Sequence, residues 1–431
     1  MNAKQANYTI VKARQLQRKL YLAAKRNSKR RFHALYDKVY KVGTLRLAWQ
    51  RVKKNKGSAG IDEVTIKQVE ENGIEKLIEK IQYNLKQGKY NPLPVKRVYI
   101  PKKDGSKRPL GIPAVIDRII QMATKIVIEP IFEADFKECS YGFRPKRNAH
   151  QALEAVRKRA NNKGWYVLDA DIKGYFDNIN HDKLLKLIKM KISDRRIIKL
   201  IRKWLKAGVI EKGRYEETDI GAPQGGVISP LLSNIYLNYL DTLWEMKYQK
   251  YGDLYRYADD FIIVSRTEGG INKALEAVKY IMNKLELKLH PVKTKIVNLW
   301  GGKEGFEFLG FHHRSIPIIE NGKRKYHSLY QWPSKKTLKS IYLEVKQILG
   351  SLDALNDNLE FLIYKLNKKI TGWKNYYGLK RAKRVLKKID NYVVKRFTIW
   401  WNRKKQNRNR RGHMTKIRRI IRDKGLKKVA C

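Results

Sequence analysis

The chain has 431 residues, and its 95 lysines and arginines outnumber its 40 aspartates and glutamates, which gives a formal net charge of +55. Charge repulsion of this size opposes folding, so it indicates a polyanionic partner, and nucleic acid is the favoured one. No apolar run approaches the roughly 18 residues of a membrane span, which excludes an integral membrane protein. The two cysteines, Cys139 and Cys431, suggest neither a zinc site nor a disulfide framework. We therefore expect a protein of the reducing cytoplasm without a membrane partner.

The N-terminal part of the chain is strongly basic. Residues 1–50 carry 13 lysines and arginines and a single acid, Asp37. Apolar residues recur there at helical spacing, which predicts amphipathic helices with cationic outer faces. These faces are either ordinary solvated surface or an RNA-binding surface, because exposed cations can neutralise phosphates. We take Lys29, Arg30 and Arg31 as candidate RNA-binding residues.

A β-hairpin is predicted next, over residues 95–113, with its turn at Asp104–Gly105. Basic residues crowd the tip, and Lys102 and Arg108 are the candidates for contacts with a triphosphate. The alternative is a solvated hairpin tip. The segment SYGFRP follows a helix further along, and its Arg144 is a second candidate phosphate contact, between turn-forming residues.

Three aspartates carry the strongest chemical signal. Asp171 ends the apolar strand in WYVLDADIKGYFDNI, and Asp259 and Asp260 lie at the turn of a second predicted hairpin, LYRYADDFIIVSR. Adjacent acids are ordinary at an exposed tip, but in a buried hairpin they repel each other unless a cation lies between them and another acid. Carboxylates on neighbouring strands can hold two divalent metals about 3.5–4 Å apart, an arrangement that supports nucleotidyl transfer.

The C-terminal third of the chain is predicted to be helical, with three long helices that start after Pro333. Trp373, Tyr376 and Tyr377 within it are either helix core or platforms for stacked bases. Residues 401–431 then carry 13 lysines and arginines and one acid, Asp423. We expect this tail to be a mobile or RNA-ordered basic arm.

The order of motifs resembles that of bacterial group II intron reverse transcriptase/maturases. IPKKDGSKRPLGIP, SYGFRP, DADIKGYFDNI, GAPQGGVISPLLSNIYL, YADD, LHPVKTKI and FEFLGF follow one another at the spacings of the family. GWKNYY, in the helical region, is similar to the maturase (thumb) signature. The resemblance covers about residues 35–400, and seven motifs in order make it specific.

The resemblance implies an α+β fold: a right-hand polymerase, with fingers and a palm built on antiparallel sheet, followed by an α-helical thumb/maturase domain. It divides the chain into a basic helical N-terminal extension at 1–75, fingers and palm at 76–315, the thumb/maturase domain at 325–400 and a basic tail at 401–431. The implied partners are the intron RNA, an RNA template with a DNA primer, dNTPs and target DNA. The implied location is the bacterial cytoplasm, at the nucleoid when the protein acts on DNA.

The resemblance also assigns the catalytic carboxylates. Asp171 and Asp259 would hold two Mg²⁺ ions, for which Mn²⁺ could substitute, and Asp260 would be the supporting third acid. Asp169 shares a face with Asp171, but the family has an aromatic residue five positions after its metal ligand. That aromatic is Phe176, which lies five residues after Asp171, so Asp171 is the predicted ligand.

The same correspondence identifies the nucleotide-binding residues. Phe176 would exclude a 2′-OH and so select dNTPs, unless it is only a core residue beside Tyr175. Gln224, with the backbone of the two glycines that follow it, would line the nucleotide and template. Lys293 would protonate the departing pyrophosphate, unless it is only an exposed lysine. The triphosphate contacts would be Lys102, Arg108 and Arg144.

Some features depart from the family pattern. Glu63 replaces a common glycine and His290 a common serine, both away from the expected metal site. The chain ends soon after the predicted thumb, so we expect no zinc-bearing endonuclease domain, and priming at transient single strands or at nascent DNA.

Three alternatives remain open. A domesticated or defence-associated reverse transcriptase is disfavoured by GWKNYY. A splicing factor with a silent polymerase is disfavoured by the intact aspartates, and an RNA-copying RNA polymerase by Phe176.

Overall fold

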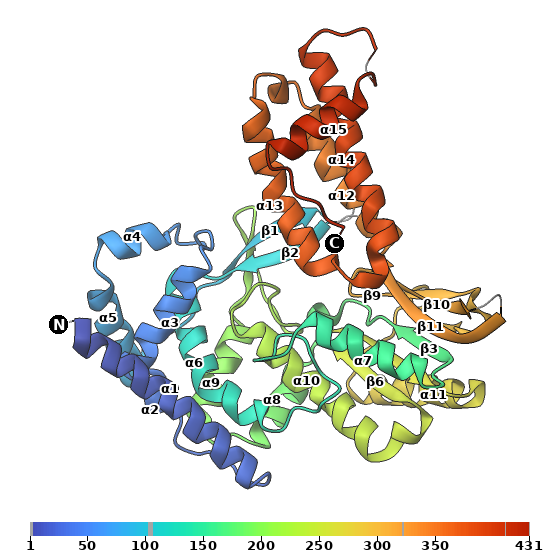
Figure 1. The fold of residues 1–431 in the computed structure, drawn as a ribbon. Helices are drawn as coiled ribbons and strands as arrows, with labels where there is room; N and C mark the ends of the chain where they lie inside the picture. Colours follow the sequence, from blue (N-terminus) through green and yellow to red (C-terminus); the bar gives the residue numbers. More distant parts are fainter. Residues whose placement is uncertain (1–2, 102–106, 321–322, 410, 431) are drawn as a thin grey trace. The chain divides into compact units, whose positions relative to one another are not determined.

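The computed structural model describes residues 3–101, 107–320, 323–409 and 411–430 (Figure 1). The chain separates into two units. The first unit comprises Met1–Ala152 and Ala170–Lys295, and the second comprises Leu153–Asp169 and Ile296–Cys431. Both helices and sheets are present, so the predicted mixed fold class is confirmed at this level.

Helices dominate the first unit. Its helices are α1 (Ala3–Arg26), α2 (Tyr36–Val39), α3 (Val42–Lys54), α4 (Ile66–Glu71), α5 (Ile74–Lys86), α6 (Val115–Glu133), α8 (His181–Lys189), α9 (Arg195–Leu205), α10 (Ser229–Leu243) and α11 (Glu268–Lys284). Helix α7 (Ala149–Asn161) begins in the first unit and ends in the second.

The N-terminal helices belong to the core of the first unit. Helices α1, α3 and α6 pack side by side (Figure 1), and α6 buries apolar residues around its whole circumference. Gly43 permits close packing of α3 on α1, because a Cβ atom there would lie 2.2 Å from the Thr9 carbonyl oxygen. Helices of residues 1–75 therefore share a core with α6, which lies in the expected fingers and palm, and the division of the chain at residue 75 stays a prediction.

The first unit holds a small sheet of strand order β2-β1-β4-β5. Strand β1 (Val95–Pro101) pairs antiparallel with β2 (Lys107–Ile112) and parallel with β4 (Val209–Glu211), which pairs antiparallel with β5 (Arg214–Glu216). The hairpin predicted over residues 95–113 is thus confirmed, although its turn, with Lys102, lies outside the described residues. A separate antiparallel hairpin joins β6 (Asp253–Tyr257) to β7 (Asp260–Ser265).

The second unit combines short strands with a helical C-terminal domain. Strands β3 (Tyr166–Ala170) and β8 (Lys295–Asn298) are neighbours in one sheet. A second sheet has the order β11-β10-β9, formed by β9 (Gly305–Phe308), β10 (Phe311–Glu320) and β11 (Lys323–Pro333). The C-terminal domain contains α12 (Lys335–Gly350), α13 (Leu359–Tyr377), α14 (Lys383–Lys404) and α15 (Met414–Asp423).

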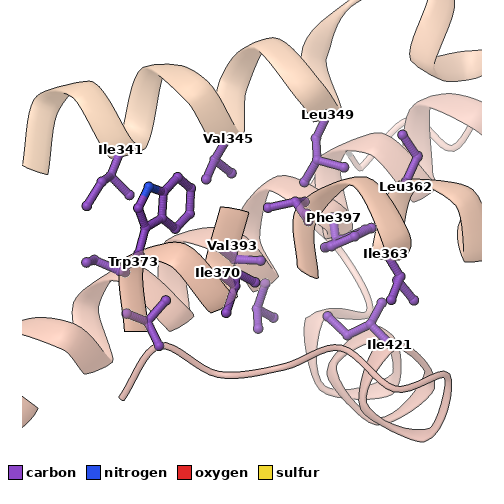
Figure 2. Close-up of a cluster of buried hydrophobic side chains, with 14 of the residues drawn as sticks. Ile341, Val345, Leu349, Leu362, Ile363, Ile370, Trp373, Val393, Phe397 and Ile421 are labelled. Carbon is purple, nitrogen blue, oxygen red and sulfur yellow. The ribbon is translucent and has the colours of Figure 1, made fainter. Parts of the chain in front are cut away.

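The core of the C-terminal domain includes the basic tail. Ile417, Ile421 and Val429 are buried in one cluster with residues of α12, α13 and α14 (Figure 2). Backbone N–H groups of Val429 and Ala430 also donate to the Asp390 carboxylate, at 2.7 and 3.1 Å. The tail is therefore not the mobile or RNA-ordered arm that we expected. Apolar residues four apart along α15 bury one face of that helix in the core.

The aromatic residues of GWKNYY are mostly internal. Trp373 is 9% exposed and packs in the same cluster, as Figure 2 shows. The Tyr376 hydroxyl donates to the Leu309 carbonyl at 3.1 Å, and the Phe311 ring contacts both Tyr376 and Tyr377. These rings stabilise the second unit, which supports the core alternative over the stacking one.

Among the helices of the described ranges, none is both long and apolar enough to cross a membrane.

One buried acid in the first unit has an unusual environment. Asp117, 1% exposed on α6, accepts hydrogen bonds from the Tyr90 hydroxyl at 2.6 Å and the Leu93 N–H at 3.2 Å. The Trp204 indole N–H in turn donates to the Tyr90 hydroxyl at 2.9 Å. Burial raises the pKa of Asp117 from its ordinary value of 3.8 to about 6. The folded protein therefore binds a proton at Asp117 more tightly than the unfolded chain does.

This shift predicts the pH dependence of stability. Because the folded pKa is the higher one, Asp117 stabilises the fold below pH 4, and that contribution is lost as pH rises through about 6. The loss is on the order of 3 kcal/mol, from about 1.4 kcal/mol per pKa unit. Denaturant unfolding of Asp117→Asn between pH 4 and 7 should lack this decline, whereas Asp182→Asn, at an exposed acid, should retain it. A wild-type slope in Asp117→Asn would contradict the assignment.

Candidate active site

The β6–β7 hairpin presents Asp259 at its turn. Tyr257 pairs with Asp260 in the ladder, so Ala258 and Asp259 form a two-residue connection. Ala258 has a φ of 60°, a left-handed conformation that costs a residue with a Cβ atom on the order of 1 kcal/mol. A strained turn persists only where its surroundings hold it in place, and here a buried arginine does so.

That residue is Arg256, which is 0% exposed although it lies in the middle of β6. Its guanidinium donates to the Ala258 carbonyl at 2.8 Å and thereby fixes the turn. It also donates to the Asp241 carboxylate at 2.8 Å and to the Asn234 side-chain oxygen at 3.0 Å, both on α10. A fourth acceptor is the Ser140 hydroxyl, at 2.8 Å. Arg256 therefore ties the turn to α10 and to the SYGFRP segment.

The SYGFRP segment packs directly against the turn. Its backbone pairs with β6, since the Arg256 N–H donates to the Cys139 carbonyl and the Tyr141 N–H to the Arg256 carbonyl, both at 2.8 Å. Gly142 is required there, because a Cβ atom would lie 2.3 Å from the Ala258 nitrogen. The segment thus positions the aspartate turn, a role that sequence analysis did not identify.

Arg144, a predicted phosphate contact, is enclosed by protein groups. Its side chain is 3% exposed and forms an ion pair with Glu133 at 2.8 Å. Its guanidinium also donates to the carbonyls of Ser140, at 2.7 Å, and Phe136, at 3.3 Å. Because backbone carbonyls and Glu133 enclose the guanidinium, Arg144 holds the SYGFRP segment in shape, and its contact with a triphosphate stays a prediction.

Asp171 follows β3 and is held by a neighbouring segment of the first unit. The His290 N–H donates to the Asp171 carbonyl at 2.7 Å, and Ile172 forms a β-bridge with Leu289. This pairing brings Lys293 to the Asp171 carboxylate, at 2.8 Å. Lys293 remains 62% exposed and Asp171 37% exposed, so the ion pair is weak and can yield to another cation.

Asp171 and Asp259 are close enough to interact electrostatically. Burial raises the pKa of the Asp259 carboxyl, the Asp171 charge raises it further, and the positive charges of Arg108 and Arg256 oppose that rise. Within the described residues, no three histidines, cysteines, aspartates or glutamates gather closely enough to hold a metal ion. The structure thus brings Asp171 and Asp259 together, while the supporting role of Asp260 stays a prediction.

Two predicted nucleotide contacts meet beside this pair. The Arg108 guanidinium donates to the Gln224 side-chain oxygen at 2.8 Å, and the Gly111 N–H donates to the Gln224 carbonyl at 2.6 Å. Gly225 has a φ of 112°, and a Cβ atom on it would lie 2.5 Å from the Gly111 carbonyl oxygen. The glycine therefore lets this loop lie flat against β2, which places Gln224 next to Arg108.

Phe176 lies in a short 3₁₀ turn, Tyr175–Asn178, and is 8% exposed. Its ring meets that of Tyr175 edge-on at 5.2 Å, and the Ala222 N–H donates to its carbonyl at 2.8 Å. This connects Phe176 to the loop that carries Gln224. The position suits both a core residue and a ring that shapes the nucleotide site, so nucleotide selection by Phe176 stays a prediction.

The candidate RNA-binding residues Lys29, Arg30 and Arg31 are exposed in the loop after α1. The loop is anchored by Phe32, whose N–H donates to the Lys191 carbonyl at 2.8 Å. Arg31 lines a cavity of about 380 Å³, with cations of α8 and α9 around it: Lys189, Arg195, Lys199 and Arg202. The basic cluster is therefore wider than the sequence suggested.

Comparisons with known proteins identify two matched domains in this chain. Residues 100–313 match the family described as reverse transcriptase (RNA-dependent DNA polymerase), and residues 338–419 match the maturase-specific domain of group II introns. The chain is 33% identical over 433 residues to the group II intron-encoded protein LtrA of Lactococcus lactis subsp. cremoris, covering 81% of this chain and 71% of LtrA.

Two further relatives are similar over shorter or more divergent stretches. Protein YkfC of Escherichia coli (strain K12) is 38% identical over 275 residues, which cover 56% of this chain and 71% of YkfC. The putative COX1/OXI3 intron 2 protein of Saccharomyces cerevisiae is 26% identical, over 81% of this chain and 40% of its own length.

The two matched domains define a reverse transcriptase with a maturase domain. The chain belongs to the family of group II intron-encoded reverse transcriptase/maturases. It is an RNA-directed DNA polymerase that depends on divalent metal, and an intron maturase that binds intron RNA and RNA templates.

Proposed function

We propose that Asp171 and Asp259 are the metal-binding residues of a right-hand polymerase that copies RNA into DNA. The observation that carries this proposal is the electrostatic proximity of the two carboxylates beside the Arg108–Gln224 contact. Residues 76–315 would then contain the fingers and palm and residues 325–400 the thumb. Asp260 would support the pair as a third acid.

The site suits a divalent cation. Two neighbouring carboxylates, one of them with a raised pKa, are more stable with a positive charge between them. The Lys293 ammonium pairs with Asp171, which supports a preference for a cation at this position. Two bound Mg²⁺ ions, or Mn²⁺ in their place, would supply stabilisation of the charge that develops during phosphoryl transfer.

The surrounding residues have separate tasks in nucleotide addition. The exposed guanidinium of Arg108 would bind the triphosphate, and Gln224 would orient both Arg108 and the incoming nucleotide. The bond from the primer 3′ oxygen to the α-phosphorus forms as the bond to the pyrophosphate oxygen breaks. Lys293 would donate a proton to that leaving pyrophosphate. The substrates proposed are therefore dNTPs and a DNA primer on an RNA template, with target DNA as the site of insertion.

The metal site predicts a selective loss in Asp259→Asn. Primer extension on RNA should fall about a thousandfold or more, since the amide removes a negative charge that holds the metals. Binding of intron RNA should be nearly unchanged, and Asp253→Asn, at the far end of β6, serves as the matched control. Retention of more than about a tenth of the wild-type rate, equivalent to about 1.4 kcal/mol, would exclude Asp259 from catalysis.

Phe176 is predicted to select the sugar. Phe176→Val should admit ribonucleotides, because a smaller side chain leaves room for the 2′-OH. The measurement is the ratio of dNTP to rNTP incorporation on one template, with Tyr175→Phe, which alters only the neighbouring hydroxyl, as control. An unchanged ratio in Phe176→Val would return this ring to a purely structural role.

The basic cluster is predicted to serve RNA binding rather than copying. Joint replacement of Lys29, Arg30 and Arg31 by Ala should weaken intron binding, impair assisted splicing and lower the salt slope by about two. Extension of a short pre-annealed primer on unstructured RNA should persist.

The matched control replaces three exposed lysines of α4 and α5, Lys67, Lys76 and Lys80, whose helices also carry acids. Both triple variants are compared in binding and extension assays across one salt series. Equal losses of intron binding and primer extension in the cluster variant would assign Lys29, Arg30 and Arg31 to the polymerase groove instead.

A further inference from the structure

The second unit contains a cavity of about 770 Å³ that the polymerase and maturase assignments leave without a role. Its walls come from the end of α7 and the segment after it, the turn after β8, strand β11 and the short 3₁₀ turn before α14. The volume lies in the range of about 300–1,000 Å³ that small-molecule sites occupy. A single nucleotide would therefore fit.

Aromatic rings with open faces line this cavity. Trp300 is 63% exposed and Tyr326 57%, an unusual degree of exposure for two large aromatic residues that line one cavity. Trp300 is nevertheless fixed in orientation: the Trp165 ring meets it edge-on at 4.7 Å, and the His327 ring lies nearly parallel to it at 6.4 Å. A fixed ring with an exposed face is suited to stacking on a planar base.

The rim of the cavity is cationic. Lys163 and Arg381 line it, and none of the described residues around it is an aspartate or a glutamate. The Arg381 guanidinium is held in place by donating to the Ser328 hydroxyl at 2.8 Å and to the Leu329 carbonyl at 3.3 Å. Positive charge beside exposed rings matches a phosphate next to a base, the pattern by which single-stranded nucleic acid is bound.

We propose that this cavity binds one unpaired nucleotide of an RNA strand, with the base stacked on Trp300 and Tyr326 and the phosphate at Lys163 and Arg381. The proposal rests on the RNA binding of the family and adds a site outside the residues proposed for catalysis. RNA is the occupant because the chain already binds it and because the lining complements its charge. A protein partner would have no need of a basic rim around open rings.

The test compares two oligonucleotides of equal charge. Labelled oligoadenylate of ten residues and a ten-residue ribose-phosphate chain without bases are titrated against the full-length protein by fluorescence anisotropy. A saturating primer–template duplex is present, so the polymerase groove is already filled. Trp300→Ala and Tyr326→Ala should each lower the affinity for oligoadenylate about fivefold or more and leave the baseless chain unaffected.

Three further variants separate the contributions of the aromatic ring and of the positive charge to the affinity for the oligonucleotides. Trp300→Phe should retain most of the affinity, because it keeps a ring. Lys163→Ala should weaken both oligonucleotides and lower their salt dependence. Tyr280→Ala removes an exposed ring of α11 in the first unit and should change neither affinity.

The two aromatic variants remove largely exposed rings, so the fold should persist, and primer extension checks that it does. Equal losses for the two oligonucleotides would overturn the proposal. So would losses in Trp300→Ala and Tyr326→Ala no larger than that of Tyr280→Ala, and the open rings would then be assigned to a protein partner. Loss of primer extension in Asp259→Asn is a separate result, so the two proposals can fail independently.

Discussion

The candidate active site depends on one buried ion pair. Arg256 and Asp241 are both 0% exposed, and the arginine also reaches Asn234, Ser140 and the Ala258 carbonyl. Breaking such a pair by removing one partner leaves an uncompensated charge and costs about 3–5 kcal/mol. The contacts with these four partners hold a turn in which Ala258 has a left-handed conformation, and that turn presents Asp259. The geometry of the proposed site is thus maintained by a buried ion pair.

The motifs of the sequence acquire distinct physical tasks around this pair. The SYGFRP segment pairs with β6 and fits its Gly142 against the turn. The loop with Gln224 lies against β2 because Gly225 permits a close approach to Gly111. Lys293 reaches Asp171 because residues 288–290 pair with the strand end that carries it. Each motif therefore either supplies a functional group or positions one.

Local sequence patterns were sufficient for many secondary-structure elements and for the turn that carries Asp259. The hairpin over residues 95–113, the turn at Asp259 and the three long C-terminal helices follow from periodicity and turn chemistry, and motif order identified the family. Contacts between side chains that are far apart in the sequence were not predictable in the same way. Nothing in SYGFRP indicates that Glu133 and backbone carbonyls enclose Arg144. The alternation of β6 indicates that Arg256 is buried, because it occupies an inward-facing position of the strand. Only the fold shows its four partners.

The basic tail shows that a highly charged segment can still pack into a hydrophobic core. Thirteen cations in residues 401–431 suggested an arm, yet Ile417 and Ile421 lie on one helical face and enter the core. The sequence likewise does not distinguish buried from exposed aromatic residues. Trp373 lies in the core, whereas Trp300 and Tyr326 are exposed. Composition indicates that RNA is bound, whereas burial decides which rings are available to bind it.

The central claim, that Asp171 and Asp259 together hold the catalytic metals, is tested most directly by diffraction. A crystal of the full-length protein with primer–template, a non-hydrolysable dNTP and Mn²⁺ would locate the ions by anomalous scattering. The account predicts two Mn²⁺ ions, with both carboxylates as ligands and the Lys293 ammonium displaced from Asp171. Mn²⁺ bound without Asp259, or Lys293 still paired with Asp171 beside the bound nucleotide, would contradict it.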